Sequence, residues 1–357
     1  MAVMKSDNYH DNQNKNNIIK LRGIMSTLPP FCKIFFRGIE EYTSTRTRLA
    51  YAYDIRLFFE FLHETNSICS KIEITEFPMS ILEQLSRMDI EEYLEYLSLY
   101  QKEGKEITND ERGKARKLAS LRSFYNYFFQ NEMISSNPAA LVPLPKRHEK
   151  EIIRLEPNEV AILLDQVEAG SKLTKKEMEY HKKTKIRDVA LLTLLLGTGI
   201  RVSECVGLDI TDVNFDVGGI KIRRKGGYEA IIYFGEEVEI ALLDYLEERE
   251  RIIPAEGHEN ALFLSLQNRR MAVRSVENLV KKYTSRVTSL KKITPHKLRS
   301  TYGTTLYQET GDIYLVADVL GHKDVNTTRK HYAALEDARR RQAANAVHLR
   351  EKRDWEE

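Results

Sequence analysis

Apolar residues recur at helical spacing through most of the first 140 residues. In RLAYAYDIRLFFEFLHE, apolar side chains three and four positions apart share one face, and MDIEEYLEYLSLY and KARKLASLRSFYNYFFQ repeat the pattern. A further helix is expected over roughly 18–41, interrupted at Pro29-Pro30. Strand patterns are almost absent here. The pattern predicts a small helical domain over 18–140 with its aromatic residues in the core.

The pattern changes after a proline-rich stretch, which we interpret as a linker over 141–154. RDVALLTLLLGTG predicts a buried helix that ends at glycines. GGIKIRRKGGYEAIIYF alternates apolar and polar residues on both sides of Gly226-Gly227, which predicts a β-hairpin. The remaining segments have helical spacing, so the strands are too few for a doubly wound sheet. We expect a mainly α fold with a small antiparallel sheet in the second domain, 155–335.

The net charge of +2 does not by itself indicate a polyanion as the partner, but the charges are unevenly distributed. Five basic residues and no acidic residue lie between positions 112 and 122, and ten basic residues with one acidic residue lie between positions 269 and 299. Local basic fields of this kind can hold a polyanion although the whole chain is nearly neutral. A solvated helix face is the alternative interpretation of either cluster.

Cysteine spacing and hydropathy exclude several classes. Cys32, Cys69 and Cys205 lie far apart without a CxxC motif, which predicts a reducing compartment and no zinc site. The longest apolar run, ALLTLLLG, is too short to span a bilayer. The polar, Asn-rich segment 1–17 is typical of a disordered tail and not of a signal peptide. We expect a cytoplasmic protein that does not associate with a membrane.

The stretch TPHKLRSTYG contains a candidate anion site. Thr294-Pro295 has the pattern of a helix start, which places His296 and Arg299 three residues apart in the first turn. Free N–H groups and a partial positive charge at a helix start favour an anion. The sequence therefore predicts that an imidazole and a guanidinium bind an anion together.

Three other stretches of the second part contain further residues that could bind or react with an anion. GTGIRVSE contains Arg201 and, one turn later, Glu204; RRKGGYE contains Lys225 beside the expected hairpin turn. VLGHKDVNTTRKHYAAL contains His322 after a helix-ending glycine, and Tyr332 ten residues later. Each residue alone has a structural explanation, such as a salt bridge or a helix cap. The set and its order are far more specific.

With its order of Arg, Lys, His-x-x-Arg, His and Tyr, the chain resembles the tyrosine recombinases, the integrase family of site-specific DNA recombinases. The resemblance covers 155–335, the family's catalytic domain, and extends more weakly to the first part, which is similar to the family's core-binding domain. It implies that the two domains clamp around DNA. It also implies that Arg201 and Arg299 hold one DNA phosphate, that His322 donates a hydrogen bond to it, and that Glu204 supports this cluster from behind.

The resemblance assigns the covalent chemistry as well. It implies that Tyr332 is the nucleophile and forms a 3′-phosphotyrosyl link, so that neither a metal nor another cofactor is needed. His296 is the family's candidate for the base, and Lys225 would protonate the leaving 5′ oxygen. In the Xer branch of the family the tyrosine usually stands nine residues after the histidine, a position that His331 holds here. The longer spacing also occurs in integrases of mobile elements.

The partner implied by the resemblance is double-stranded DNA with inverted-repeat half-sites, bound by a homotetramer. Chromosome dimer resolution and integration or excision of a mobile element both stay open. The alternatives are a DNA-relaxing enzyme like the type IB topoisomerases and a non-catalytic DNA-binding protein. A C-terminal helix or tail over 336–357 would dock on the neighbouring protomer. We expect DNA contacts from basic residues of the first domain and the linker: Arg46, Arg48, Lys114, Arg116, Lys117, Arg122, Lys146 and Arg147.

Overall fold

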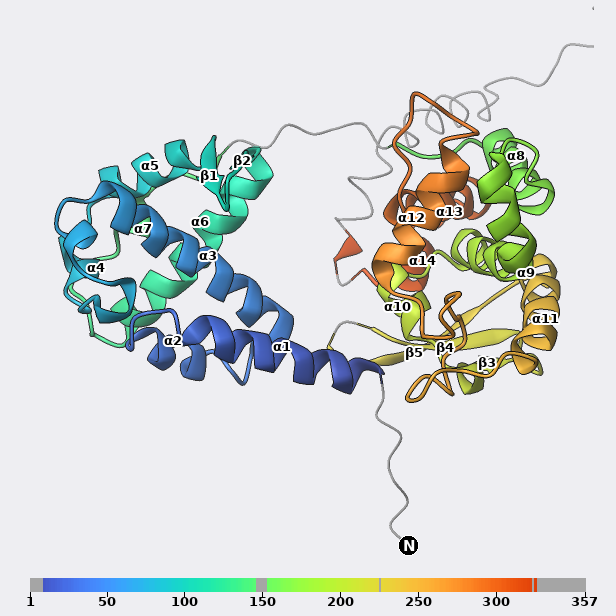
Figure 1. Cartoon of the computed structure of the whole chain (residues 1–357), viewed down its shortest axis with the longest axis horizontal. Helices are drawn as coiled ribbons and strands as arrows, with labels where there is room; N and C mark the ends of the chain where they lie inside the picture. Colours follow the sequence, from blue (N-terminus) through green and yellow to red (C-terminus); the bar gives the residue numbers. More distant parts are fainter. Residues whose placement is uncertain (1–8, 146–152, 225, 323, 326–357) are drawn as a thin grey trace, which may run out of the picture. The chain divides into compact units, whose positions relative to one another are not determined.

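The computed structural model describes residues 9–145, 153–224, 226–322 and 324–325 (Figure 1). The chain divides into two compact units, of which the first ends at Lys150 and the second begins at Glu151. Both units are mainly helical, and each contains one small antiparallel sheet. The expected fold class, helical with a small sheet in the second unit, is therefore confirmed.

Short and long helices alternate in the first unit. Its elements are α1 (Tyr9–Met25), α2 (Cys32–Gly38), α3 (Thr45–Thr65), the 3-10 turns η1 (Cys69–Lys71) and η2 (Ile74–Glu76), α4 (Ile81–Gln84), α5 (Arg87–Tyr96), β1 (Tyr100–Lys102), β2 (Lys105–Ile107), α6 (Glu111–Gln130) and α7 (Pro138–Leu141). Helix α3 begins where Ser44 Oγ accepts a hydrogen bond from the Thr47 amide. Helix α6 begins in the same way, with the Asp110 carboxylate and the Gly113 amide.

The core of the first unit is aromatic, as the sequence predicts. Phe35, Phe58, Phe59, Phe124 and Phe128 are fully or almost fully buried. Their rings meet mostly edge to face; the centroids of Phe35 and Phe124 lie 5.1 Å apart, and those of Phe124 and Phe128 lie 5.0 Å apart. Edge-to-face contacts add to the burial of these large rings. They hold α2, α3 and α6 together.

Two expectations for the first unit are wrong. Residues 9–17, assigned to a disordered tail, are the first half of helix α1. This polar half is stabilised by a contact with another helix, because Thr45 Oγ1 at the start of α3 donates a hydrogen bond to Asn14 Oδ1 over 2.7 Å. The hairpin β1–β2 was also not expected. Its turn is formed by Glu103 and Gly104, which both have positive φ angles, and its strands are too short to show alternation.

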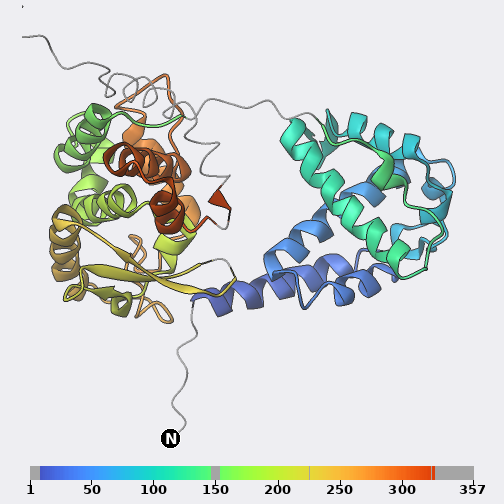
Figure 2. The same ribbon diagram turned by 180° about the vertical axis from the view of Figure 1, so that it is seen from behind.

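The second unit is arranged around one long helix. Its elements are α8 (Pro157–Ala169), α9 (Lys175–Thr198), α10 (Val202–Gly207), the 3-10 turn η3 (Ile210–Asp212), β3 (Val213–Asn214), β4 (Gly219–Arg223), β5 (Glu229–Tyr233), α11 (Glu236–Glu250), α12 (Val273–Thr284), α13 (Pro295–Thr310) and α14 (Ile313–Leu320). Helix α9 packs against α8, α11 and α13. The sheet lies at one side of these helices, as Figures 1 and 2 show.

The predicted hairpin is present and forms the larger part of the sheet. Strands β3, β4 and β5 are antiparallel neighbours in that order, and Ile220 pairs with Ile232 on the buried face. Between β4 and β5 the chain turns at Gly226 and Gly227, both with positive φ. Such angles favour glycine, which explains the pair in the sequence.

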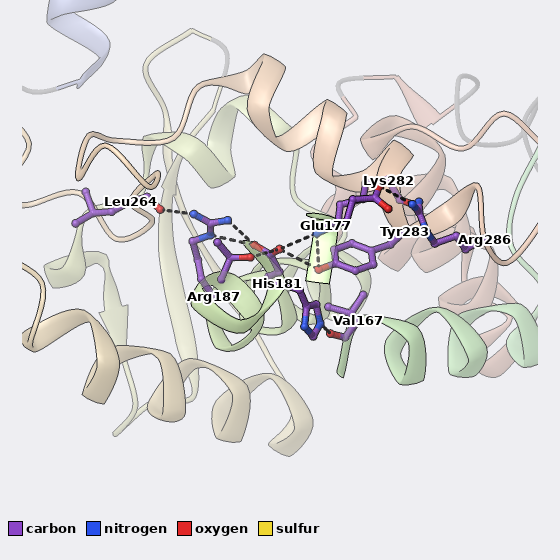
Figure 3. A network of polar contacts seen from close by, with 10 residues as sticks. Val167, Glu177, His181, Arg187, Leu264, Lys282, Tyr283 and Arg286 are labelled. Carbon is purple, nitrogen blue, oxygen red and sulfur yellow. Dashed lines mark hydrogen bonds and ion pairs between the residues drawn. The ribbon is translucent and has the colours of Figure 1, made fainter. Parts of the chain in front are cut away.

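Helix α9 starts earlier than the apolar pattern indicates, and its polar first half is held by a network of charged groups. Asp188 is buried and accepts hydrogen bonds from the Arg187 guanidinium (2.6 Å) and from Tyr283 Oη (3.1 Å). Figure 3 shows Arg187 reaching the Leu264 carbonyl on one side, while Arg286 pairs with Glu177 on the other. The network therefore fixes α12 against α9.

Candidate active site

The joint between α9 and α10 positions Arg201. Gly199 ends α9 in the left-handed conformation (φ 62°), and its amide donates to the Leu195 carbonyl. Two residues later Arg201 takes an extended conformation and starts α10. The buried Glu204 carboxylate accepts from the Arg201 amide and from Arg201 Nη1, both over 2.7 Å. Glu204 therefore orients the guanidinium.

Helix α13 begins at Pro295, as Thr-Pro predicts. Thr294 occupies the N-cap position, although its side chain makes no capping hydrogen bond. His296 lies in the first turn and is exposed, whereas Arg299, one turn on, is 5% exposed. Helix α13 also contacts the start of the second unit, because Thr301 Oγ1 accepts a hydrogen bond from the Leu155 amide.

Helix α14 places His322. Asp312 caps its start, where the carboxylate accepts from the amides of Tyr314 and Leu315. The helix ends at Gly321, which has a left-handed conformation (φ 61°). The His322 amide donates a hydrogen bond to the Ala317 carbonyl over 2.9 Å. This bond caps the C-terminus of α14 and fixes the backbone of His322.

The two arginines from distant segments converge at this helix end. Arg299 donates to the Gly199 carbonyl over 2.6 Å and to the Leu320 carbonyl, and Arg201 Nη2 donates to the Gly321 carbonyl over 3.3 Å. Leu320 and Gly321 directly precede His322. The structure thus brings Arg201, Arg299 and His322 together, with Glu204 behind them. Two fixed guanidinium groups side by side suit an oxyanion such as a phosphate.

A third guanidinium at the same helix end was not anticipated. Arg224 directly follows β4 in the turn of the hairpin, and its guanidinium donates hydrogen bonds to the carbonyls of Asp318 (3.0 Å) and Val319 (2.7 Å). The sequence offered only the basic run RRK at the hairpin, and nothing in that run distinguishes this arginine from its neighbours.

Four expected functional residues lie outside the described part of the chain. They are Lys225 and Tyr332, expected in the catalytic set, and Lys146 and Arg147, expected to contact DNA from the linker. The expected C-terminal helix over 336–357 lies outside it as well.

The first unit uses part of its expected DNA-contact set internally, which requires a correction. Arg48 is 7% exposed and pairs with Glu40 over 2.8 Å. Lys117 is 8% exposed and donates to Asn109 Oδ1 over 2.7 Å, and burial lowers the pKa of its ammonium group. Arg122 donates to the carbonyls of Ala139 and Val142. Arg48 and Lys117 are therefore poor candidates for phosphate contacts, and Arg122 holds α7 against α6.

The other members of that set are more accessible. Arg46 is exposed in the first turn of α3. Lys114 is half-buried and donates to Ser98 Oγ over 2.6 Å. The Arg116 side chain is 53% exposed, although it pairs with the buried Asp54. Arg46 is thus the best placed of the three for a DNA contact.

A basic hollow of about 620 Å³ and a second of about 600 Å³ lie along α12. The second continues to Thr294 and Pro295 at the start of α13, and its cationic lining residues are Arg274, Lys281, Lys291 and Lys292. Lys291 is paired with Glu159 over 2.5 Å, whereas Arg274, Lys281 and Lys292 are exposed. We call this second hollow, with its four cationic lining residues, the α12 basic groove. It corresponds to the basic segment between positions 269 and 299 of the sequence.

The described residues provide neither a membrane-spanning helix nor a metal-binding cluster. No helix in this part of the chain is long and apolar enough to cross a membrane. No group of three or more His, Cys, Asp and Glu side chains within it could hold a metal ion.

Comparisons with known proteins show which family the chain is similar to. Residues 154–339 match the profile of the phage integrase family. Tyrosine recombinase XerC of Caldanaerobacter subterraneus subsp. tengcongensis is 34% identical over 313 residues, which cover 85% of this chain and 81% of the relative. XerH site-specific recombinase, bound to palindromic difH substrate, aligns with a TM-score of 0.66 at 18% identity and covers 94% of this chain and 89% of its own. Tn1549 transposon integrase with circular intermediate DNA reaches 0.61 at 21% identity, over 88% of this chain and 99% of its own.

Proposed function

This chain belongs to the phage integrase family and is a site-specific tyrosine recombinase, and from that premise we propose how its residues cleave and rejoin DNA. One observation carries the proposal. Arg201 and Arg299, about a hundred residues apart, meet at the carbonyls of Leu320 and Gly321, directly before His322. With His296 one turn before Arg299, this arrangement fits the scissile phosphate of DNA.

In the proposed reaction, the Tyr332 hydroxyl attacks the phosphorus while the bond to the 5′ oxygen breaks. The tyrosine proton passes to a base, for which His296 is the candidate, and Lys225 protonates the leaving 5′ oxygen. The product is a 3′-phosphotyrosyl link and a free 5′ hydroxyl, so no water is consumed. Attack by a 5′ hydroxyl of a second strand reverses the step and completes strand transfer.

Tyrosine needs help in this role, because its hydroxyl has an ordinary pKa of about 10. Arg201 and Arg299 would neutralise the charge that develops on the non-bridging oxygens of the pentavalent transition state. His322 would add a hydrogen bond to one of those oxygens. Glu204 would keep Arg201 in its orientation through the two hydrogen bonds described above.

The substrate we propose is a duplex with two inverted half-sites, and the active assembly is a homotetramer on two duplexes. The relatives support DNA as the partner, since the XerH and Tn1549 structures contain it. The XerC relative favours chromosome dimer resolution, whereas the Tn1549 integrase and the ten-residue spacing between His322 and Tyr332 favour a mobile element. Recovering the bound site from the source genome distinguishes these roles, since the site lies either at a single chromosomal locus or at the ends of an element.

The experiment that tests the chemistry uses this recovered site with a nick beside the cleavage point, so that the released fragment diffuses away and the covalent adduct accumulates. The wild-type chain should form an adduct that survives denaturing electrophoresis. Tyr332→Phe should bind the same DNA and form none, because it lacks the attacking oxygen. Tyr314→Phe, which alters an exposed tyrosine on α14, is the matched control and should react normally.

An adduct in the Tyr332→Phe protein would place the nucleophile elsewhere, and His331, one residue earlier, would be the first to examine. Absence of any adduct with the wild-type chain on its own recovered site would reject the proposed chemistry.

A further inference from the structure

The C-terminal carbonyls of α14 are bound in an unusual way. Four consecutive carbonyls, from Asp318 to Gly321, each accept a hydrogen bond from a guanidinium group: Arg224 reaches the first two, Arg299 the third and Arg201 the fourth. The end of a helix carries a partial negative charge and carbonyls without helical partners. Three cations from three different segments therefore hold one short helix end, and two of them belong to the proposed phosphate site.

Arg224 differs from Arg201 and Arg299 in the element that holds it. It sits in the turn of the β4–β5 hairpin, where its amide donates to the Tyr228 carbonyl over 2.7 Å and its carbonyl accepts from the Gly227 amide over 3.1 Å. Its side chain lies directly on Gly321: a Cβ placed on Gly321 would come within 2.1 Å of Arg224 Nη1 and 2.5 Å of Cζ. Arg224 thus links the sheet to the helix end through close packing as well as hydrogen bonds.

Binding of a phosphate changes the hydrogen bonds that these arginines make to the C-terminal carbonyls of α14. A guanidinium binds a singly charged DNA phosphate more strongly than a neutral carbonyl, and Arg201 and Arg299 have to turn donors toward it. Wherever a donor turns from a carbonyl to the phosphate, the carbonyl of Leu320 or Gly321 loses that donor. Those of Asp318 and Val319 do not depend on the phosphate site, because their donors are Arg224, which serves both, and the Gly321 amide, which donates to the first.

On the basis of the proposed function, we propose that Arg224 is a positioning residue. It holds the last turn of α14, and with it His322, in place while Arg201 and Arg299 exchange carbonyl oxygens for phosphate oxygens. In this role Arg224 touches neither DNA nor the reacting atoms. It acts on the rate of the chemical step and not on the affinity for DNA.

The test measures adduct formation at saturating nicked DNA and, separately, the dissociation constant of the same DNA. Arg224→Ala should lower the adduct rate about tenfold or more and leave the dissociation constant unchanged, because a displaced catalytic group slows chemistry. Arg224→Lys should recover part of the rate, since an ammonium group can still donate to one carbonyl. Lys221→Ala removes a cation of strand β4 that pairs with Glu229 on β5 and should match the wild type.

A second variant tests the packing. Gly321→Ala should displace the Arg224 side chain and lower the adduct rate by itself. It should cost less when combined with Arg224→Ala, because the shortened side chain leaves room for the added methyl group. Hydrogen exchange at the amides of Gly321 and His322 should accelerate in Arg224→Ala, as a direct measure of a loosened helix end.

Each contrary outcome overturns the proposal. An unchanged adduct rate or unchanged exchange in Arg224→Ala would make the contact irrelevant to positioning. Equal losses of rate and affinity would make Arg224 a DNA contact, and additive effects of the two substitutions would reject the packing argument. Wild-type protein is the reference throughout: if it forms no adduct, the proposed function fails, whereas a reactive wild type with a fully reactive Arg224→Ala rejects only the role of Arg224.

Discussion

At the scale of single residues, Asp54 shows how one buried carboxylate organises the first unit. It lies on α3 and accepts hydrogen bonds from Arg116 Nη2 and Ser120 Oγ on α6, both over 2.7 Å. The carboxylate is buried, whereas the Arg116 side chain is about half exposed. A buried charge needs its partner, so Arg116 has a structural task whatever else it contacts.

Arg116→Ala should therefore destabilise the protein, by about 2 kcal/mol in the free energy of unfolding, less than for a fully buried pair because water reaches the arginine. Chemical denaturation of the full chain measures this change. Adding Asp54→Asn should restore part of the loss, since the unpaired charge is then removed. Arg112→Ala, on the exposed side of the same helix, is the control. Unchanged stability combined with weaker DNA binding would assign Arg116 to DNA alone.

Glu177 gives a prediction for the dependence of stability on pH. Its carboxylate accepts hydrogen bonds from the Thr174 amide (2.9 Å), from Thr174 Oγ1 (2.8 Å) and from Arg286 (2.5 Å). The amide and hydroxyl of Thr174, followed by Arg286, lower the pKa of Glu177 from 4.5 to about 2. Because the folded pKa is depressed, this contribution is fully present above pH 4.5 and is lost as the pH falls toward 2.

The melting temperature of Glu177→Gln should accordingly be lower than that of the wild type at neutral pH, and the difference should shrink between pH 4.5 and 2. Thermal unfolding of both proteins over this pH range provides the measurement. Glu179→Gln, two residues away and exposed, is the control. A difference that stays constant with pH would mean that Glu177 acts by packing and not by charge.

At the scale of elements, α12 is held on one side and open on the other. Val276, Val280 and Tyr283 are fully buried, and Tyr283 donates to Asp188. The opposite side presents the exposed cations of the α12 basic groove, which ends at the start of α13 near His296. The rigid inner face thus gives the exposed cations a fixed position beside the proposed phosphate site.

Replacing Lys281 and Lys292 together by alanine should weaken DNA binding and reduce its dependence on salt. Each lost phosphate contact should lower the slope of log affinity against log salt concentration by roughly one unit. Binding titrations at several salt concentrations measure the slope. Lys182→Ala, which removes an exposed cation from α9, should leave the slope unchanged. If the double variant keeps the wild-type slope, the groove is a solvated surface.

The elements also show what could be predicted from the sequence. The hairpin β4–β5 was predictable because Gly226-Gly227 separates two alternating segments, and α13 was predictable from Thr294-Pro295. The first half of α9 was not, because its side chains are mostly polar and it is stabilised by a contact with Arg286, in the loop after α12. Apolar periodicity detects only helices that bury an apolar stripe.

The same reasoning explains the outcome at the site. Arg201, Arg299 and His322 could be proposed as site residues because their order along the chain is specific, and the structure brings them to one helix end. The DNA contacts of the first unit were predicted from charge alone, which does not reveal burial: Arg48 and Lys117 turned inward. Arg224 was missed because its partners are main-chain carbonyls, which every sequence has.

At the scale of the whole molecule, the proposed homotetramer requires several copies of the chain to act together. We expect the residues after Asp337 to dock on a neighbouring protomer, because a short helix with a small apolar face is not stable alone in water. Truncation after Asp337 should leave a chain that folds and binds one half-site. Cooperative binding to two half-sites should fall by at least about tenfold, and strand exchange should fail.

Gel-shift titrations on one and two half-sites, followed by a recombination assay, measure both effects. A truncated protein that recombines at the full rate would make these residues dispensable, and protomer contacts would have to come from elsewhere.

The contact between Arg224 and Gly321 also restricts the order in which mutations can accumulate. Any other residue at position 321 must adopt a positive φ and place its Cβ where the Arg224 guanidinium lies. A smaller residue at position 224 must therefore appear before glycine 321 can be replaced. A saturation library at position 321 alone should return glycine among active clones, whereas a library that varies both positions should yield active proteins with other residues at 321. We therefore expect the hairpin and the helix end, almost a hundred residues apart in sequence, to evolve as a pair.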